Sequence, residues 1–268
     1  MAMNADLSVD ALADVLGDRS VRSYPALLST EATAMAWARE GAPSGSLVVA
    51  DYQASPRGRG GLPWIVTAGH GLGFTLIARP VLAPEREGWP YVTSLLALHD
   101  VLGARNTGLT WPDTVHGPTG ETLASLGVYV ELGPSRTEWL TMTVLVQEAT
   151  PPRDGLLAEL VQALEERLAA PPGVVLSAYL GRCSTLGQQR RARLIPMGPG
   201  GPEVTGEAVD VLADGALVLL TERGNRVAIP PQNLGMLQEP QGVIEMPAEL
   251  IGRPGFEIPE QPPTTPEP

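Results

Sequence analysis

The chain has 268 residues, of which 43% are hydrophobic and 18% are charged, so it is long and apolar enough to bury a sizeable core. Its net charge of −12 argues against a nucleic-acid-binding surface, because contacts with phosphates need clustered basic side chains. The single cysteine, Cys183, excludes an intramolecular disulfide and a multi-cysteine metal site.

Neither a membrane span nor a signal peptide is predicted. No segment approaches the roughly 18 continuous apolar residues of a membrane span. Residues 1–6 lack a basic region followed by an apolar one. We therefore expect a cytoplasmic location and no membrane partner.

The first two thirds of the chain are predicted to mix helices and strands. Ser29 or Thr30 is expected to cap the helix predicted over residues 31–41. The helix predicted over residues 156–169 is the clearest amphipathic helix, because its apolar residues lie on one face. Hydrophobic periodicity therefore predicts an α/β protein of the α+β type, with a mixed sheet and helices. The predicted helices cover residues 6–17, 31–41, 91–102 and 156–169, and the predicted strands cover 46–52, 72–78, 126–132 and 139–147.

The last third is predicted to be mostly β-structure. A helix over 175–183 is expected to contain Cys183 as buried filler. Short strands then alternate with Gly/Pro turns, with the lengths expected of a small barrel. These strands are predicted over residues 190–195, 203–211, 216–221 and 226–230. The Pro-rich segment 239–268 is expected to be flexible, because it cannot bury enough apolar surface to fold by itself.

The densest binding chemistry lies in residues 49–64, where an apolar strand runs into an Arg/Gly loop and then into Trp64. Glycines at 58, 60 and 61 can adopt positive φ and turn backbone N–H groups to one side. Arg57 and Arg59 add forked donors and fixed charge. This pattern predicts an anion-binding loop.

The loop resembles the signature of the biotin protein ligases, A-E-x-Q-x-x-G-R-G-R-x-G-R-x-W. The matching residues are Gln53, Arg57, Gly58, Arg59, Gly61 and Trp64. Further segments similar to the family follow in the family's order over roughly residues 20–238. They are 28–33 (the S-T-N opening), 71–80 (G-L-Y-x-S-x-x-x-R-P), 111–114 (W-P-N-D), and Tyr179, Cys183, 185–187, 206–210 and 214–217 in the closing domain.

The resemblance implies a domain organisation and an activity. It implies an N-terminal extension over 1–19, a catalytic-type domain of the biotin/lipoate ligase fold over 20–172, and an SH3-like domain over 173–238 ahead of the flexible tail. The implied reaction uses ATP with Mg²⁺ to convert biotin or a related acid to an acyl-adenylate. The acyl group then passes to a lysine of a biotin carboxyl carrier domain or another carrier protein. No bound cofactor is implied, and a homodimer is possible.

A DNA-binding role is not expected. Many members of the family carry an N-terminal winged helix, but only about twenty residues precede the resemblance here. No P-loop is present, and no G-x-S-x-G elbow supports a hydrolase. His70, His99 and His116 are scattered without metal-ligand partners, so no metal site is expected.

By resemblance, the substrate-binding residues are Ser29, Thr30, Gln53, Arg57, Gly58, Arg59, Gly61 and Trp64. Gln53 would contact the biotin, Trp64 the adenine, and Arg59 the carboxyl and phosphate end. Each has an ordinary alternative: Ser29 and Thr30 as helix caps, Trp64 as a core residue, and the two arginines as a solvated turn.

The chain also departs from the family pattern. Pro56, Leu62 and Glu31 replace a glycine, an arginine and an asparagine, and strand 139–145 lacks the glycines that make room for biotin. The family's R-K-L-A-G lysine would align near Thr122 or Ala124, neither of which is cationic, so no catalytic residue is assigned. Two hypotheses follow: a ligase with an unusual, degenerate site, or an inactive homologue that binds a ligand or partner.

Overall fold

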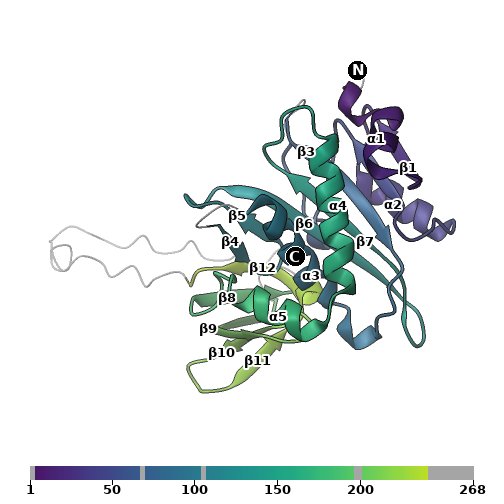
Figure 1. Ribbon diagram of the computed structural model, residues 1–268. Helices are drawn as coiled ribbons and strands as arrows, with labels where there is room; N and C mark the ends of the chain where they lie inside the picture. The colour runs from purple at the N-terminus through teal and green to yellow at the C-terminus, as the bar shows by residue number, and fades with distance from the viewer. Residues whose placement is uncertain (1–3, 67–69, 104–106, 196–200, 241–268) are drawn as a thin grey trace, which may run out of the picture.

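A seven-stranded mixed sheet organises the computed structural model, which describes residues 4–66, 70–103, 107–195 and 201–240 (Figure 1). Its strand order is β1-β2-β3-β7-β6-β5-β4, and only the β1–β2 pair is parallel. The registers place the C-terminal end of β2 and the start of β3 level with the end of β7 and the start of β6. The strands are β1 (Val21–Tyr24), β2 (Leu47–Ala50), β3 (Leu72–Ala78), β4 (Gly108–Thr110), β5 (Thr114–His116), β6 (Thr122–Leu132) and β7 (Thr137–Val146).

Helices cover both faces of this sheet. Helix α2 (Thr30–Arg39) packs its alanines on a small cluster that includes Val48, Ile77 and Trp139. On the opposite face, α3 (Trp89–Leu102) and α4 (Asp154–Ala169) bury the main core. Alternate residues of each strand therefore face different helices.

The sequence explains these helices locally. Residues Trp89–Leu98 of α3 are all buried, which suits a helix enclosed between the sheet and α4. Helix α4 is amphipathic, and Leu157, Leu160 and Leu164 form its buried stripe. None of the helices in the described part of the chain combines the length and apolar character needed to cross a membrane.

A buried ion cluster ties the N-terminal segment to the sheet. Arg153, at the N-terminal end of α4, is 1% exposed and pairs with Asp6 and Asp51 at 2.8 Å each. Its Nη1 also donates to the Gly71 carbonyl at 3.2 Å. The cluster thus joins the 3-10 turn η1 (Ala5–Leu7) and helix α1 (Val9–Leu16) to the ends of β2 and β3.

A second, five-stranded antiparallel sheet lies beside the first, in the green-to-yellow part of Figure 1. Its order is β11-β10-β9-β8-β12, and helix α5 (Pro172–Leu180) leads into it. The Trp111 indole N–H donates to the Gly215 carbonyl at 2.9 Å and links the two parts. The strands are β8 (Gln189–Leu194), β9 (Glu203–Val211), β10 (Leu217–Leu220), β11 (Arg226–Ile229) and β12 (Leu234–Gln238).

The predicted α+β class is confirmed, as are the main helices and strands of both parts. The prediction that Cys183 lies inside a helix is wrong: α5 ends at Leu180, and Cys183 lies in a buried bridge with Leu109, where burial raises the pKa of its thiol. Strands β1, β4, β5 and β12 were not predicted. The domain boundaries and the closure of the second sheet into an SH3-like barrel stay predictions, and the tail beyond residue 240 lies outside the described residues.

Candidate functional site

The signature loop, residues 56–64, folds back on itself. The Gly58 amide donates to the Leu62 carbonyl at 2.8 Å, and the Gly61 amide donates to the Gly58 carbonyl at 3.0 Å. Gly60 and Gly61 have φ values of 61° and 74°, a conformation that favours glycine. Because these amides bond within the loop, they do not converge on one anion position in this conformation.

Two glycines let the loop lie close to its neighbours. A Cβ on Gly58 would lie 2.4 Å from the Trp64 indole, and a Cβ on Gly127 of β6 would lie 3.1 Å from Gly58 Cα. The first distance is a clash, and the second is tighter than ordinary packing allows. The loop is therefore held between the Trp64 ring and the sheet.

The two loop arginines have different surroundings. Arg57 is exposed, and its Nη1 donates to the Gly61 carbonyl at 3.0 Å. Arg59 is only 7% exposed: its Nε donates to Asp113 at 2.8 Å, and its Nη1 donates to the Leu234 carbonyl at the start of β12. Arg59 therefore links the loop to the second sheet, and an anionic ligand would compete with Asp113 for its guanidinium.

A buried chain of polar side chains lies where α2 begins. Gln53 Oε1 accepts hydrogen bonds from the Thr30 amide at 2.8 Å and the Thr30 hydroxyl at 3.1 Å. The Thr75 hydroxyl donates to Thr30 Oγ1 at 2.9 Å and lies 3.0 Å from the Thr143 hydroxyl. All four residues are at most 3% exposed, so they form a closed polar floor between α2, β3 and β7.

Ser29 takes the position of a helix cap. Its hydroxyl accepts a hydrogen bond from the Ala32 amide at 3.5 Å at the N-terminus of α2. Thr30 and Gln53 are thus brought together by the structure, whereas the Ser29 side chain caps the helix.

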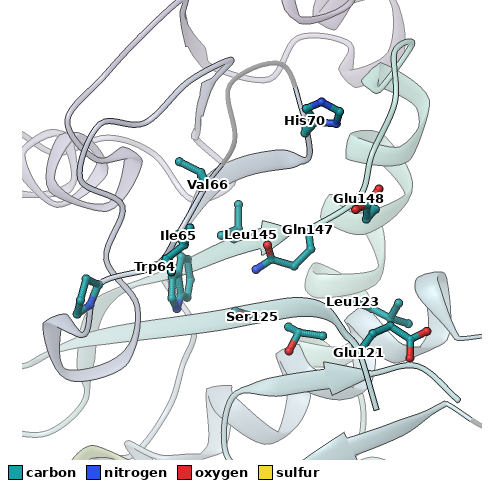
Figure 2. Close-up of a pocket in the computed structure, with 12 residues that line it drawn as sticks. Trp64, Ile65, Val66, His70, Glu121, Leu123, Ser125, Leu145, Gln147 and Glu148 are labelled. Carbon is teal, nitrogen blue, oxygen red and sulfur yellow. The ribbon is translucent and has the colours of Figure 1, made fainter. Parts of the chain in front are cut away.

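A cavity of about 820 Å³ opens next to Trp64 (Figure 2). Trp64 forms one wall, Leu145 stands between Trp64 and Gln147, and Ser125 of β6 lies below them. Because Ser125 and Leu145 are paired across β6 and β7, the cavity lies on the sheet face that also carries the loop. The described lining comprises Pro63, Trp64, Ile65, Val66, His70, Glu121, Thr122, Leu123, Ser125, Leu145, Gln147 and Glu148.

The charge of this lining is negative or neutral. Glu121 and Glu148 contribute carboxylates, and no lysine or arginine is among the described residues of the cavity wall. A hydrogen bond from the Thr119 hydroxyl lowers the pKa of Glu121, so it is ionised near neutral pH. A phosphate entering this cavity would therefore lack a nearby cation from its lining.

The two positions predicted to correspond to the family's lysine differ in orientation. Thr122 lines the cavity and is exposed, whereas Ala124 is 0% exposed and packs in the main core. Ser125, the next residue along β6, again faces the cavity. A cation that serves the cavity could therefore project from Thr122 or Ser125 but not from Ala124.

Glu31 has an unusual environment. Burial raises the pKa of Glu31 to about 7, and the positive charge of Arg57 opposes this rise. The carboxyl group therefore titrates in the physiological range beside a loop arginine. No other described residue near the loop combines these properties.

The histidines do not form a metal site in the described residues, where no group of three His, Cys, Asp or Glu side chains gathers. His116 Nε2 lies 2.8 Å from the Ser184 hydroxyl, which in turn donates to the Leu109 carbonyl. Because the hydroxyl proton is held by a carbonyl, this pair is not an activated nucleophile.

Several residues of the site were not singled out from the sequence. Thr75 and Thr143 complete the polar floor, and Asp113 holds Arg59. Asp113 lay in a segment noted for its family resemblance, but its partner is 54 residues away in the chain. The two threonines lie in apolar strands, and the sequence of such a strand does not reveal the hydrogen-bond partner of a threonine hydroxyl.

Sequence comparisons find relatives among the biotin ligases. No protein-family model matches the chain. The biotin–acetyl-CoA-carboxylase ligase of Mycobacterium tuberculosis is 29% identical over 220 residues, which cover 71% of this chain and 79% of the relative. The bifunctional ligase/repressor BirA of Bacillus subtilis is 34% identical over 107 residues, 38% of this chain and 32% of the relative.

Solved structures share the fold. The biotin protein ligase of Aquifex aeolicus in complex with biotin and ATP superposes with a TM-score of 0.59 at 19% identity, covering 82% of this chain and 99% of that protein. The architecture is therefore that of the biotin protein ligases. In sequence as well as in fold, the chain is therefore similar to the biotin protein ligases.

Proposed function

We propose that the protein uses ATP to convert biotin or a related acid to an acyl-adenylate and transfers the acyl group to a lysine of a carrier protein. The observation that carries this proposal is the Arg57-Gly58-Arg59 loop packed on β6 next to the cavity and the Thr30–Gln53 floor. This arrangement puts a basic loop, a buried polar floor and an open cavity on one face of the sheet. It suits a reaction that positions a carboxylate and a triphosphate together.

The names of the relatives support the substrates. The M. tuberculosis relative is a ligase for acetyl-CoA carboxylase, and the A. aeolicus ligase was solved with biotin and ATP. We extend this to Mg²⁺ with the ATP and to a biotin carboxyl carrier domain as the partner. The proposed binding residues are Ser29, Thr30, Gln53, Arg57, Gly58, Arg59, Gly61 and Trp64, and a cytoplasmic location is part of the same proposal.

We expect the activation step to be slow. The lining of the cavity supplies no cation among its described residues, and Arg59 is already paired with Asp113. Removing one preorganised charge or donor typically costs on the order of a hundred- to a thousandfold in rate. The same two observations favour a second candidate, a non-catalytic member of the family that binds a ligand or partner.

Mass spectrometry of the full chain with ATP, Mg²⁺, biotin and a carrier domain tests the proposal. The expected result is biotinyl-AMP and a biotin-sized mass increase on the carrier lysine, formed slowly and weakened further by Arg59→Ala. Arg57→Ala is the matched comparison, because Arg57 is exposed and has no carboxylate partner at hydrogen-bond distance among the described residues. Binding of a non-hydrolysable biotinyl-AMP analogue without any product would favour the second candidate, and no binding would remove both.

A further inference from the structure

The signature loop belongs to a longer connection between two neighbouring strands. Strand β2 ends at Ala50, and the pair of Ala50 with Gly73 of β3 is the last pair of their ladder. Between these strand ends the chain carries Gln53 of the polar floor, the loop 56–64 and His70 of the cavity lining. The position of the loop therefore depends on how the two strand ends are held.

One side chain joins the two strand ends just beyond this last pair. Arg153 Nη2 donates to Asp51 Oδ1 at 2.8 Å, and Arg153 Nη1 donates to the Gly71 carbonyl at 3.2 Å. Asp51 directly follows β2, and Gly71 directly precedes β3. The side chains of Arg153 and Asp51 are both 1% exposed, so their ion pair is shielded from water. Arg153 therefore clamps the base of the connection that carries the loop.

The second end of this clamp is packed closely against β7. A Cβ on Gly71 would lie 2.5 Å from the Val146 carbonyl oxygen and 3.0 Å from the Gln147 carbonyl oxygen, and the φ of Gly71 is 76°. Both the contact and the φ favour glycine at this position. Val146 stands in the chain between Leu145 and Gln147, which line the cavity. A displacement of Gly71 would therefore reach the cavity wall.

The N-terminal segment fixes the orientation of the Arg153 side chain. Asp6 accepts hydrogen bonds from the backbone N–H and Nε of Arg153 at 2.8 Å each, and from its Nη2 at 3.1 Å. Asn4 donates to the Asp51 carboxylate from its backbone and its side chain, at 3.1 and 3.2 Å. All three guanidinium nitrogens are thus engaged in directions set by the planar fork, which a lysine ammonium does not reproduce.

We propose that Arg153 is a positioning residue of the ligase reaction, because it clamps both ends of the segment that presents the signature loop. This inference rests on the proposed function. A clamped base limits the positions open to the loop, so less conformational freedom is lost when the loop closes on its ligand. Loosening the base should therefore weaken binding of the acyl-adenylate even while the protein stays folded.

Arg153→Lys tests the clamp, because lysine keeps the buried positive charge but does not bond both strand ends in the geometry of the fork. The matched control is Arg19→Lys, the same substitution at the opposite end of β2. Arg19 donates to the Gly45 carbonyl at 2.7 Å and pairs with Glu165 of α4 at 2.7 Å. The control thus disturbs the same strand and the same helix without touching the base of the loop.

Two measurements are made on the full chain. Calorimetry gives the affinity for a non-hydrolysable biotinyl-AMP analogue, and hydrogen exchange follows the Gly58 and Trp64 amides, which donate to the Leu62 and Pro56 carbonyls. Exchange of these amides reports local opening of the loop, and the amides of β10 give the reference for global stability. Arg153→Lys should weaken analogue binding and accelerate exchange at both loop amides by about tenfold each, whereas Arg19→Lys should change each by less than about twofold.

The inference is overturned if either the analogue affinity or the loop exchange of folded Arg153→Lys stays within about twofold of the Arg19→Lys value. If Arg153→Lys does not fold, Asp51→Asn takes its place with the same expected results and the same criterion. Asparagine keeps an oxygen for Arg153 but loses the charge that holds the guanidinium at the end of β2. A wild type that does not bind the analogue refutes the proposed function, and the loop exchange alone then decides the role of Arg153.

Discussion

Replacing Arg153 with methionine should destabilise the whole protein. Arg153 donates to Asp6, Asp51 and the Gly71 carbonyl, and the side chains of all three charged residues are at most 7% exposed. Methionine keeps much of the buried stem but removes the cation. Two buried carboxylates are then left without their counter-charge.

The expected loss follows from this burial. Removing one partner of a buried ion pair typically costs about 3–5 kcal/mol, because the remaining charge is uncompensated. Asn4 still donates to Asp51 from its backbone and side chain at 3.1 and 3.2 Å, which places the expected loss near the lower end. A domain of this kind has a total stability of about 5–15 kcal/mol, so the change is a large fraction of it.

Urea unfolding at pH 7 measures the effect, with Arg167→Met as the control. Arg167 pairs with Asp100 at 2.6 Å, but both side chains are about a quarter or more exposed. An exposed pair of this kind contributes about 0–1 kcal/mol. A loss below about 1 kcal/mol for Arg153→Met, no larger than for Arg167→Met, would refute the reasoning.

The pH dependence gives a second check. The hydrogen bonds from Arg153 are the main cause that lowers the pKa of Asp6. A depressed folded-state pKa adds stability above the unfolded pKa of about 3.9, and this stability is lost as pH falls through the folded value. The difference between wild type and Arg153→Met should therefore be full at pH 7 and shrink below about pH 4.

Two predictions concern the loop. Gly127→Ala should weaken binding of a biotinyl-AMP analogue with little loss of stability, since the new Cβ would lie 3.1 Å from Gly58 and push the loop away. Calorimetry measures the affinity and thermal unfolding measures the stability, and an unchanged affinity would contradict the prediction. Glu31→Gln should remove a pH dependence of analogue binding: in the wild type the affinity should fall between pH 6 and 8, because Glu31, with a pKa of about 7, gains negative charge next to Arg57. A wild-type affinity that stays flat over this range would exclude a role for Glu31.

The predicted helices and strands match the structure best where turn residues such as Gly and Pro bound an apolar run. Strand β3 matches its predicted range of 72–78, because an apolar run is bounded by Gly71 and Arg79-Pro80. Strand β12 was missed, since its five residues contain a glycine and follow a Pro-rich turn, and only antiparallel pairing with β8 makes it a strand. The helix predicted over residues 175–183 ends earlier, at Leu180, because Gly181 forms its C-cap, and Cys183 therefore lies outside it.

The candidate site was predicted in part. The loop residues were identified from their type and spacing, which are local properties of the chain. Their contacts were not, because Arg59 meets Leu234 at a sequence separation of 175 residues and spacing carries no information about such a partner. The sequence showed that β7 lacks the family's glycines, but only the structure places Leu145 of this strand in the lining of the cavity.

The orientation of β6 decides how a missing cation could be replaced. Ser125 faces the cavity directly opposite Leu145, whereas Ala124 is enclosed in the main core. A lysine introduced as Ser125→Lys would extend into the cavity, and Glu121 and Glu148 in the same lining would keep it charged. If the slow step reflects the absence of a cation, this variant should accelerate biotinyl-AMP formation by on the order of a hundredfold.

The matched control is Ser125→Met, which adds similar length without charge. It should leave the rate unchanged or lower it, because it fills the cavity without neutralising the triphosphate. Single-turnover formation of biotinyl-AMP, followed by mass, separates this step from transfer to the carrier. Equal rates for folded wild type and Ser125→Lys would mean that charge in the cavity does not limit activation.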